Sequence, residues 1–153
     1  MKKRISAMLL SCLLLMLFLP MQALAANTQS TIIRYEDGSY SVTTVKRVGA
    51  AARASGTVTG ATEVTHYSSS GTVEWIASLT ATFSYTGSSA RCTSVDNLSV
   101  RIFESGWSMV SKSSSKSGNT ATGNITMRYS GLTGAGSFPI TLTLSCDKNG
   151  NLS

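Results

Sequence analysis

The stretch from Val73 to Tyr85, VEWIASLTATFSY, decides the fold. Every odd position in it is apolar, and every even position except Ile76 is polar. Side chains alternate between the two faces of a strand, so this period of two predicts a long strand with one face in a core. Trp75 is in phase with the apolar positions, and we expect it to anchor that core.

The same alternation recurs along the chain, in the stretches Leu98–Ile102, Trp107–Met109, Ala121–Tyr129 and Phe138–Cys146. Turn-forming residues separate these stretches, and the part of the chain after residue 26 has no window with a convincing helical period. Several short strands at near-regular spacing predict an antiparallel β-sandwich, immunoglobulin-like or similar. A small β-barrel is the alternative.

The turn signals also predict the domain organisation. Ser68–Gly71 divides a strand at about 57–67 from the one at 72–85, and Asp37-Gly38 in the segment YEDGSY predicts a hairpin. The small residues of Val48–Gly56 read as a linker, so residues 27–56 are expected to form a loosely attached hairpin and linker, and 57–153 the sandwich domain. We expect Lys112–Asn119 to be a long solvated loop.

The first residues have the pattern of a secretory signal peptide. A basic start, MKKR, is followed by an apolar run from Ile5 to Leu19 and by the exit ALAA at residues 23–26. The apolar run is shorter than the roughly 20 residues that a membrane anchor needs. The sequence therefore predicts that residues 1–26 are removed, that the protein is secreted, and that no stable membrane span remains.

Charge excludes one class of partner. The chain has 13 basic and 7 acidic residues, and three of the basic ones leave with the signal, so the mature chain of about 127 residues carries net charge +3. Its charges are scattered, with Lys46-Arg47 the only basic pair. A nucleic-acid-binding protein shows a basic stripe with interleaved aromatic residues, and we expect no nucleic-acid partner.

Two cysteines, Cys92 and Cys146, remain after signal removal. Both are in phase with inward-facing neighbours, and an even number of cysteines in an exported chain indicates a disulfide. A Cys92–Cys146 bond would close a loop of about 54 residues, worth roughly 4 kcal/mol in the chain-entropy account. Two free buried thiols are the alternative if the host is a Gram-positive bacterium.

Metal and cofactor sites are not expected. Zinc needs three or four ligands, and one histidine with two distant cysteines does not supply them. The segment Asp147–Asn151 resembles a calcium loop, but its glycine stands at position four rather than six and no glutamate follows at position twelve. We expect a tight turn there.

No catalytic constellation is visible, and the acid and base candidates are few. His66 is expected opposite Val73, on the face of Trp75. Glu74 is expected opposite Thr65 and Glu63 opposite Ile76, so the two carboxylates would share one face of a hairpin. Two carboxylates across a sheet could serve a glycosidase, but a pair of solvated charges on the outer face is the favoured interpretation. We expect no catalytic residue.

Aromatic residues are the remaining lead to a ligand. Exposed rings line the binding faces of many modules, and Trp107, Tyr67 and Tyr129 are the candidates for such a face. Trp107 follows a glycine at a position where a sandwich edge could expose it. The partner would be an unknown protein or a glycan.

Four segments resemble a family of small secreted proteins of Gram-positive, often gut-dwelling, bacteria: YEDGSY (35–40), WIASLTATFSYTGSSARCTS (75–94), SKSGNTATG (115–123) and LTLSCDKNGNLS (142–153). The resemblance implies secretion, one β domain and paired cysteines, and no catalytic residue, because the function of that family is unknown. We therefore expect a secreted, non-enzymatic binding protein. The alternatives are an enzyme acting on cell walls or glycans through Glu63, Glu74 or His66, and a secreted effector against neighbouring cells.

Overall fold

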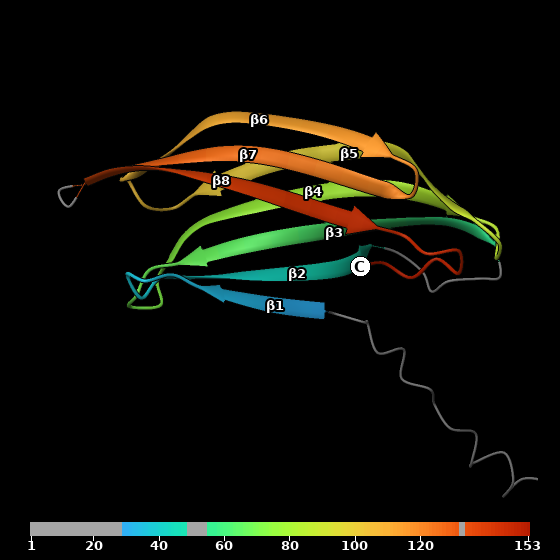
Figure 1. The fold of residues 1–153 in the computed structure, drawn as a ribbon, viewed down its shortest axis with the longest axis horizontal. Coiled ribbons are helices and arrows are strands. Elements are labelled where there is room, and N and C mark those ends of the chain that lie inside the picture. The colour runs from blue at the N-terminus through green and yellow to red at the C-terminus, as the bar shows by residue number, and fades with distance from the viewer. Residues whose placement is uncertain (1–28, 49–54, 132–133) are drawn as a thin grey trace, which may run out of the picture.

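The computed structural model describes residues 29–48, 55–131 and 134–153. Within them the chain forms the strands β1 (Gln29–Arg34), β2 (Tyr40–Val48), β3 (Gly56–Tyr67), β4 (Val73–Tyr85), β5 (Ala90–Ile102), β6 (Trp107–Ser117), β7 (Thr120–Gly131) and β8 (Gly134–Ser145). They form two antiparallel sheets, in the orders β1-β2-β3-β4-β5 and β6-β7-β8, and Figure 1 shows the smaller sheet lying across the larger. The predicted β-sandwich is confirmed, and the described strands do not close into a barrel. The expected signal peptide lies outside the described residues.

The strand order is simpler than in an immunoglobulin-like sandwich. That fold distributes neighbouring strands between its two sheets through Greek-key connections. Here each sheet is a meander in which consecutive strands pair, and the described chain changes sheet once, between β5 and β6. The β5–β6 connection therefore brings one end of the larger sheet against the first residue of the smaller.

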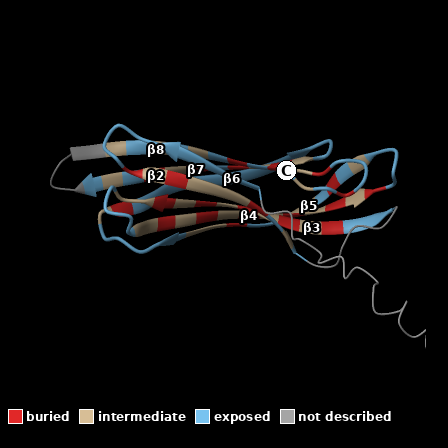
Figure 2. Cartoon of the chain, turned by 90° about the horizontal axis from the view of Figure 1, so that it is seen from below, coloured by how far each residue is buried: buried red, intermediate tan, exposed pale blue. Residues whose placement is uncertain are grey.

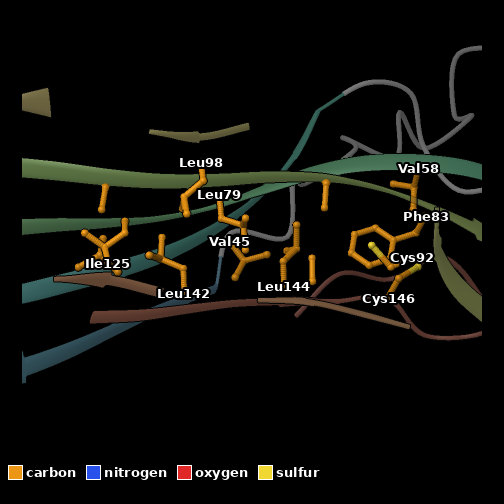
Figure 3. Close-up of a cluster of buried hydrophobic side chains, with 14 of the residues drawn as sticks. Val45, Val58, Leu79, Phe83, Cys92, Leu98, Ile125, Leu142, Leu144 and Cys146 are labelled. Atoms are coloured by element: carbon orange, nitrogen blue, oxygen red, sulfur yellow. The ribbon is translucent and has the colours of Figure 1, made fainter. Parts of the chain in front are cut away.

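The inner face of β4 is the centre of the core, as its alternation predicted. Its inward residues are between 0% and 4% exposed: Trp75, Ala77, Leu79, Ala81, Phe83 and Tyr85. Figure 2 shows the alternation of buried and half-buried positions along β4. The facing sheet contributes Ile125, Leu142 and Leu144, which Figure 3 shows opposite Leu79. Each such side chain contributes about 1.5–3 kcal/mol through the apolar surface that it removes from water.

The N-terminal hairpin, β1 and β2, belongs to the same five-stranded sheet as β3, β4 and β5, so the expectation of a loose attachment is wrong. The predicted turn at Asp37-Gly38 is confirmed, with Gly38 at φ 85°. Beyond it, β2 pairs with β3 along its whole length, from Tyr40↔Tyr67 to Val48↔Thr59. The sequence did not predict this pairing because β2 lacks a row of buried apolar residues. Only Ser41 and Val45 are buried in this strand. The expected linker lies mostly at residues 49–54, outside the described residues.

The expected loop at Lys112–Asn119 is also wrong over most of its length. Residues up to Ser117 continue β6, in register with β7 from Lys112↔Ile125 to Ser117↔Thr120. Every residue of β6 except Trp107 is exposed, so no apolar period marks the strand. Backbone pairing with β7 forms this strand, and that pairing leaves no trace in the pattern of side chains.

The last residues fold back on the end of the sandwich. Ser145 and Ser153 exchange backbone hydrogen bonds of 2.7 and 3.0 Å, and Gly150 stands at φ 82° in the turn between them. The Asp147 carboxylate accepts the backbone N–H groups of Asn149 and Asn151, each at 2.8 Å. The segment that resembles a calcium loop is thus a tight turn, as expected.

Both cysteines point into this end of the core. Cys92 is 2% and Cys146 0% exposed, and Figure 3 shows their side chains together beside Phe83. Their backbone N–H groups are bonded to the carbonyls of Gly118 and Asn119, neighbours in the β6–β7 turn. The inward orientation is confirmed. Both sulfurs are free thiols here, so the disulfide stays a prediction.

Candidate functional site

The end of the sandwich opposite the cysteines contains a small pocket of about 170 Å³, which we call the polar pocket. It lies where the β1–β2 turn, the β3–β4 turn and the first residue of β6 meet. Its lining residues are Asp37, Ser39, His66, Ser68, Ser69, Glu74, Trp107, Tyr129 and Phe138. Aromatic walls and two carboxylates therefore share one concavity.

His66 forms part of the pocket wall and is only 2% exposed. It lies opposite Trp75, not opposite Val73 as predicted, and its ring stacks on the indole at 4.9 Å with an interplanar angle of 12°. Its Nδ1 is 3.0 Å from Ser41 Oγ, and its Nε2 is 3.3 Å from Glu74 Oε2. Burial lowers the pKa of His66, and the negative charge of Asp37 raises it by a smaller amount. The ring is therefore neutral near pH 7.

Glu74 reaches this face through an irregularity in β4. The register passes from His66↔Trp75 to Tyr67↔Val73, so Glu74 is an extra residue that has no partner of its own on β3. Strict alternation would direct Glu74 to the outer face, whereas a β-bulge redirects a side chain. Its carboxylate accordingly contacts His66 and accepts a hydrogen bond of 3.0 Å from Trp107 Nε1. The backbone carbonyl of Glu74 also accepts the N–H of Phe103, which ties β4 to the β5–β6 connection.

Desolvation controls the electrostatics of Glu74. Burial raises the pKa of this carboxyl, the hydrogen bond from Trp107 opposes that shift, and the negative charges of Glu104 and Asp37 add to it. Asp37 differs because it is exposed and accepts both the N–H and the hydroxyl of Ser39, which lower its pKa. The pocket therefore combines a fully ionised carboxylate near its mouth with a partly desolvated one inside.

Three rings form the apolar wall of the pocket. Trp107 is 7% exposed, and its ring centroid lies 5.2 Å from that of Tyr129 and 5.0 Å from that of Phe138, both tilted. On its other side it meets Trp75 edge to face at 5.9 Å. A β-carbon at Gly106 would lie 2.7 Å from the Tyr129 ring, so the glycine lets that ring reach the pocket.

Hydrogen bonds join Tyr35 to Ser41 and Ser41 to His66, and His66 Nε2 lies 3.3 Å from Glu74 Oε2. Tyr35 Oη is 3.2 Å from Ser41 Oγ. In the bond between Ser41 Oγ and His66 Nδ1, the tautomer of the imidazole sets which atom donates. The order serine, histidine, carboxylate matches that of a hydrolytic triad. Ser41 is 3% exposed, however, and does not line the polar pocket, so a substrate in the pocket does not reach its hydroxyl.

The structure brings together some of the residues singled out in the sequence and separates others. Trp107 and Tyr129 share the polar pocket, although Trp107 is buried where exposure was expected. Tyr67 lies elsewhere and stacks on Tyr40 at 4.7 Å, and the Arg34 guanidinium lies over the Tyr40 ring at 5.5 Å from its centroid. Tyr67 is therefore part of a surface stack rather than of the pocket.

The expected pairing of Glu63 with Glu74 is wrong. Glu63 lies opposite Ser78 on the outer face of β3, 3.4 Å from Lys46 Nζ, while the bulge turns Glu74 inward. Thr65 faces Ile76 instead of Glu74. Two carboxylates on opposite faces of a sheet do not flank one glycosidic bond.

Sequence reasoning missed three members of the site, Asp37, Ser41 and Phe138. Asp37 stood out only as a turn residue, Ser41 is one serine among many, and Phe138 continues an ordinary apolar alternation. None of the three carries a local chemical signal. They become neighbours only because the end of β1, the start of β2 and part of β8 lie close to the start of β6 in the fold.

Comparison with known proteins adds little on function. No protein-family model matches the chain, and no curated protein matches it. Among solved structures, a hypothetical protein of Listeria monocytogenes EGD-e is similar, with a TM-score of 0.48 and 20% identity over 82% of this chain and 91% of that one.

The described residues contain no group of three or more His, Cys, Asp or Glu side chains placed to hold a metal ion. Within the same residues, no helix has the length and apolarity to cross a membrane.

Proposed function

We propose that the chain is an exported, non-enzymatic binding protein whose ligand enters the polar pocket. One observation carries the proposal: the Glu74 carboxylate lies in a concave site walled by aromatic rings, oriented there by Trp107 and His66. Binding sites combine apolar walls with a few fixed polar groups in this way. Because the pocket is well below the roughly 300 Å³ typical of whole small-molecule ligands, it accommodates one group of a larger ligand.

Catalysis is the second candidate, because Ser41 is hydrogen-bonded to His66 and His66 contacts Glu74, which is the order of a triad. Two features weigh against it. The serine hydroxyl is buried away from the pocket, and its own contacts are already made with Tyr35 and His66. The chain therefore orients His66 and Glu74 instead of activating a nucleophile. The third possibility, a secreted effector against neighbouring cells, stays a prediction.

A fragment titration of the exported protein tests the proposal. Small sugars, amino acids, amines and carboxylates would be added while the indole N–H signal of Trp107 and the ring signals of His66 and Tyr129 are followed by NMR. We expect at least one fragment to shift these signals in saturable fashion and to leave those of Tyr67 unchanged. Turnover of an ester or glycan substrate that Ser41→Ala abolishes would instead establish the enzyme.

We further propose that Cys92 and Cys146 form a disulfide on export. Both thiols are buried at the same end of the core, and burial is the main cause that raises the pKa of each. The intact mass of the protein from culture medium tests both export and the bond. It should correspond to a chain lacking the signal and two hydrogens, and should not change on alkylation. Two alkylated thiols would refute the bond.

A further inference from the structure

The charge of the polar pocket indicates the kind of group that it binds. Its titratable side chains are Asp37, Glu74, His66 and Tyr129, and among the described residues no lysine or arginine lines it. Burial keeps His66 neutral near pH 7, so no side chain of the lining carries a positive charge there. Glu104 adds a further negative charge in the vicinity of Glu74. A cationic group entering the pocket is attracted, and an anionic one is repelled.

The walls select among cations. Trp107, Tyr129 and Phe138 present aromatic surface, and aromatic faces attract a cation placed within about 6 Å of the ring centroid. Glu74 Oε2 already accepts from Trp107 and contacts His66, and Asp37 Oδ1 accepts two bonds from Ser39. A primary ammonium would have to replace the hydration of three N–H groups with acceptors that already hold other hydrogen bonds or lie at the mouth. A methylated ammonium has no N–H to satisfy, so it loses less on entering.

The volume of the polar pocket and the groups at its mouth further limit which cation fits. A volume of about 170 Å³ equals that of roughly five or six water molecules at about 30 Å³ each, enough for a nitrogen with three methyl groups. The mouth presents the exposed carboxylate of Asp37 and the hydroxyls of Ser68 and Ser69. These groups suit a hydroxyl on the rest of the ligand and disfavour a phosphate.

We propose that the polar pocket binds the trimethylammonium group of a choline-like compound. This inference rests on the proposed function, because it names the ligand of the same pocket. The ring wall contacts the methyl groups on one side, Glu74 and Asp37 supply the compensating charge, and the mouth hydroxyls meet the hydroxyl of the ligand. The positioning of Glu74 by the bulge in β4 is what places a charge beside the rings.

Titration of the exported protein with four probes tests the proposal. They are choline, its neutral isostere with carbon in place of nitrogen, ethanolamine, and phosphocholine. We expect choline to bind at least about tenfold more tightly than the neutral isostere, the effect of one desolvated cation–π and charge interaction. Ethanolamine and phosphocholine should both bind more weakly than choline. Equal binding of choline and the isostere, or tighter binding of phosphocholine, would overturn the proposal.

Matched variants assign the effect to the pocket. Glu74→Gln and Asp37→Asn should each weaken choline binding, whereas Glu63→Gln, which removes the same charge on the outer face, should leave it unchanged. Phe138→Leu should weaken it, and Tyr129→Phe, which keeps the ring, should have little effect. Equal losses in Glu63→Gln and Glu74→Gln would show that choline senses only net charge, and would refute the site.

The same titration separates this inference from the proposed function. If choline fails but a sugar or another fragment shifts the signals of Trp107 and Tyr129, the pocket is a binding site and the cation class is wrong. If no probe and no fragment shifts these signals, both proposals fall.

Discussion

The two ends of the sandwich bury different kinds of side chain. At the cysteine end, Phe83, Tyr85, Cys92 and Cys146 fill the space with apolar surface, and the C-terminal turn covers it. At the histidine end, a neutral imidazole and a carboxylate take the place of apolar side chains. Desolvation raises the pKa of the thiols and of Glu74 and lowers that of His66, so every group is pushed toward its neutral form. For thiols that costs little at neutral pH, whereas for Glu74 it opposes the charge it normally carries.

The cysteine end is thus built for stability, whereas the histidine end keeps titratable groups that stability does not require. Apolar residues of similar volume are often as stabilising as buried polar or charged groups, or more so, and packing alone therefore does not account for His66 and Glu74. Perturbed titratable groups in a concave site are typical of functional sites. Variants and conditions that act on one end and not on the other separate the two roles.

Phe83→Ala should have the largest effect. Phe83 is 0% exposed, and truncation of a buried phenylalanine typically costs about 3–5 kcal/mol of the free energy of unfolding. Urea denaturation of the variant measures it, with Ser84→Ala, the outward neighbour, as a control expected within about 0.5 kcal/mol of wild type. A loss of less than about 1 kcal/mol in Phe83→Ala would show that the cysteine end is not the stabilising one.

Reduction of the protein should have the next largest effect. If Cys92 and Cys146 are bonded, opening their loop should lower the free energy of unfolding by on the order of 4 kcal/mol. Denaturation with and without reductant measures the change, and a variant with alanine at both positions should not respond to reductant. Stability that is identical in both conditions for wild type would favour two free thiols.

Gly150→Ala tests how the C-terminal turn closes the cysteine end. Gly150 has φ 82°, and a β-carbon there would lie 2.7 Å from the ring of Tyr85. Backbone strain and this contact together should cost about 1–3 kcal/mol. Gly118→Ala is the matched control, because its φ is also positive, at 55°, but its β-carbon would meet nothing within 4 Å. Equal losses in both variants would mean that the turn does not bear on Tyr85.

The pH dependence of stability should show the smallest effect and isolates the histidine end. The pKa of His66 is lowered from 6.5 in the folded state, so below about pH 6.5 the unfolded chain binds the proton first and stability falls. The pKa of Glu74 is raised from 4.5, so the folded chain binds that proton first and stability rises as pH falls toward 4.5. In wild type the two slopes, each at most about 1.4 kcal/mol per pH unit, partly cancel.

Glu74→Gln removes one side of that balance. The variant should lose more stability between about pH 7 and about pH 5 than wild type, because the compensating protonation of Glu74 is gone. Urea denaturation at the two pH values measures the difference, and Glu63→Gln should follow wild type. A flatter profile in Glu74→Gln than in wild type would contradict the assignment of these pKa shifts.

Much of the cysteine end could be predicted from the sequence, and much of the histidine end could not. The period of two placed Phe83, Cys92 and Cys146 in the core, because burial on one face of a strand imposes that period on the chain. The strand at Lys112–Ser117 was not predicted from such a period, because side chains on both of its faces are exposed to solvent. The pairing of β2 with β3 was not predicted either, because the inward residues of β2 are partly polar.

The site depended on a single irregularity. Alternation places Glu74 on the outer face with Glu63, and pairing without a bulge sets it opposite Thr65. One extra residue in β4 reverses its direction and brings it to His66 and Trp107. A bulge has no residue signature here, so sequence alone assigned the carboxylate to the wrong face.

The sequence by itself determined an all-β chain with an inward row on β4, two inward cysteines and a hairpin at Asp37-Gly38. These features are local, because they follow from side-chain alternation and turn chemistry within a few residues. Only the tertiary structure decided that Asp37, His66, Glu74 and Trp107 meet in one pocket. The pocket depends on the sheet register, on the bulge in β4 and on the crossing from β5 to β6. These three features bring together residues that are far apart in the chain.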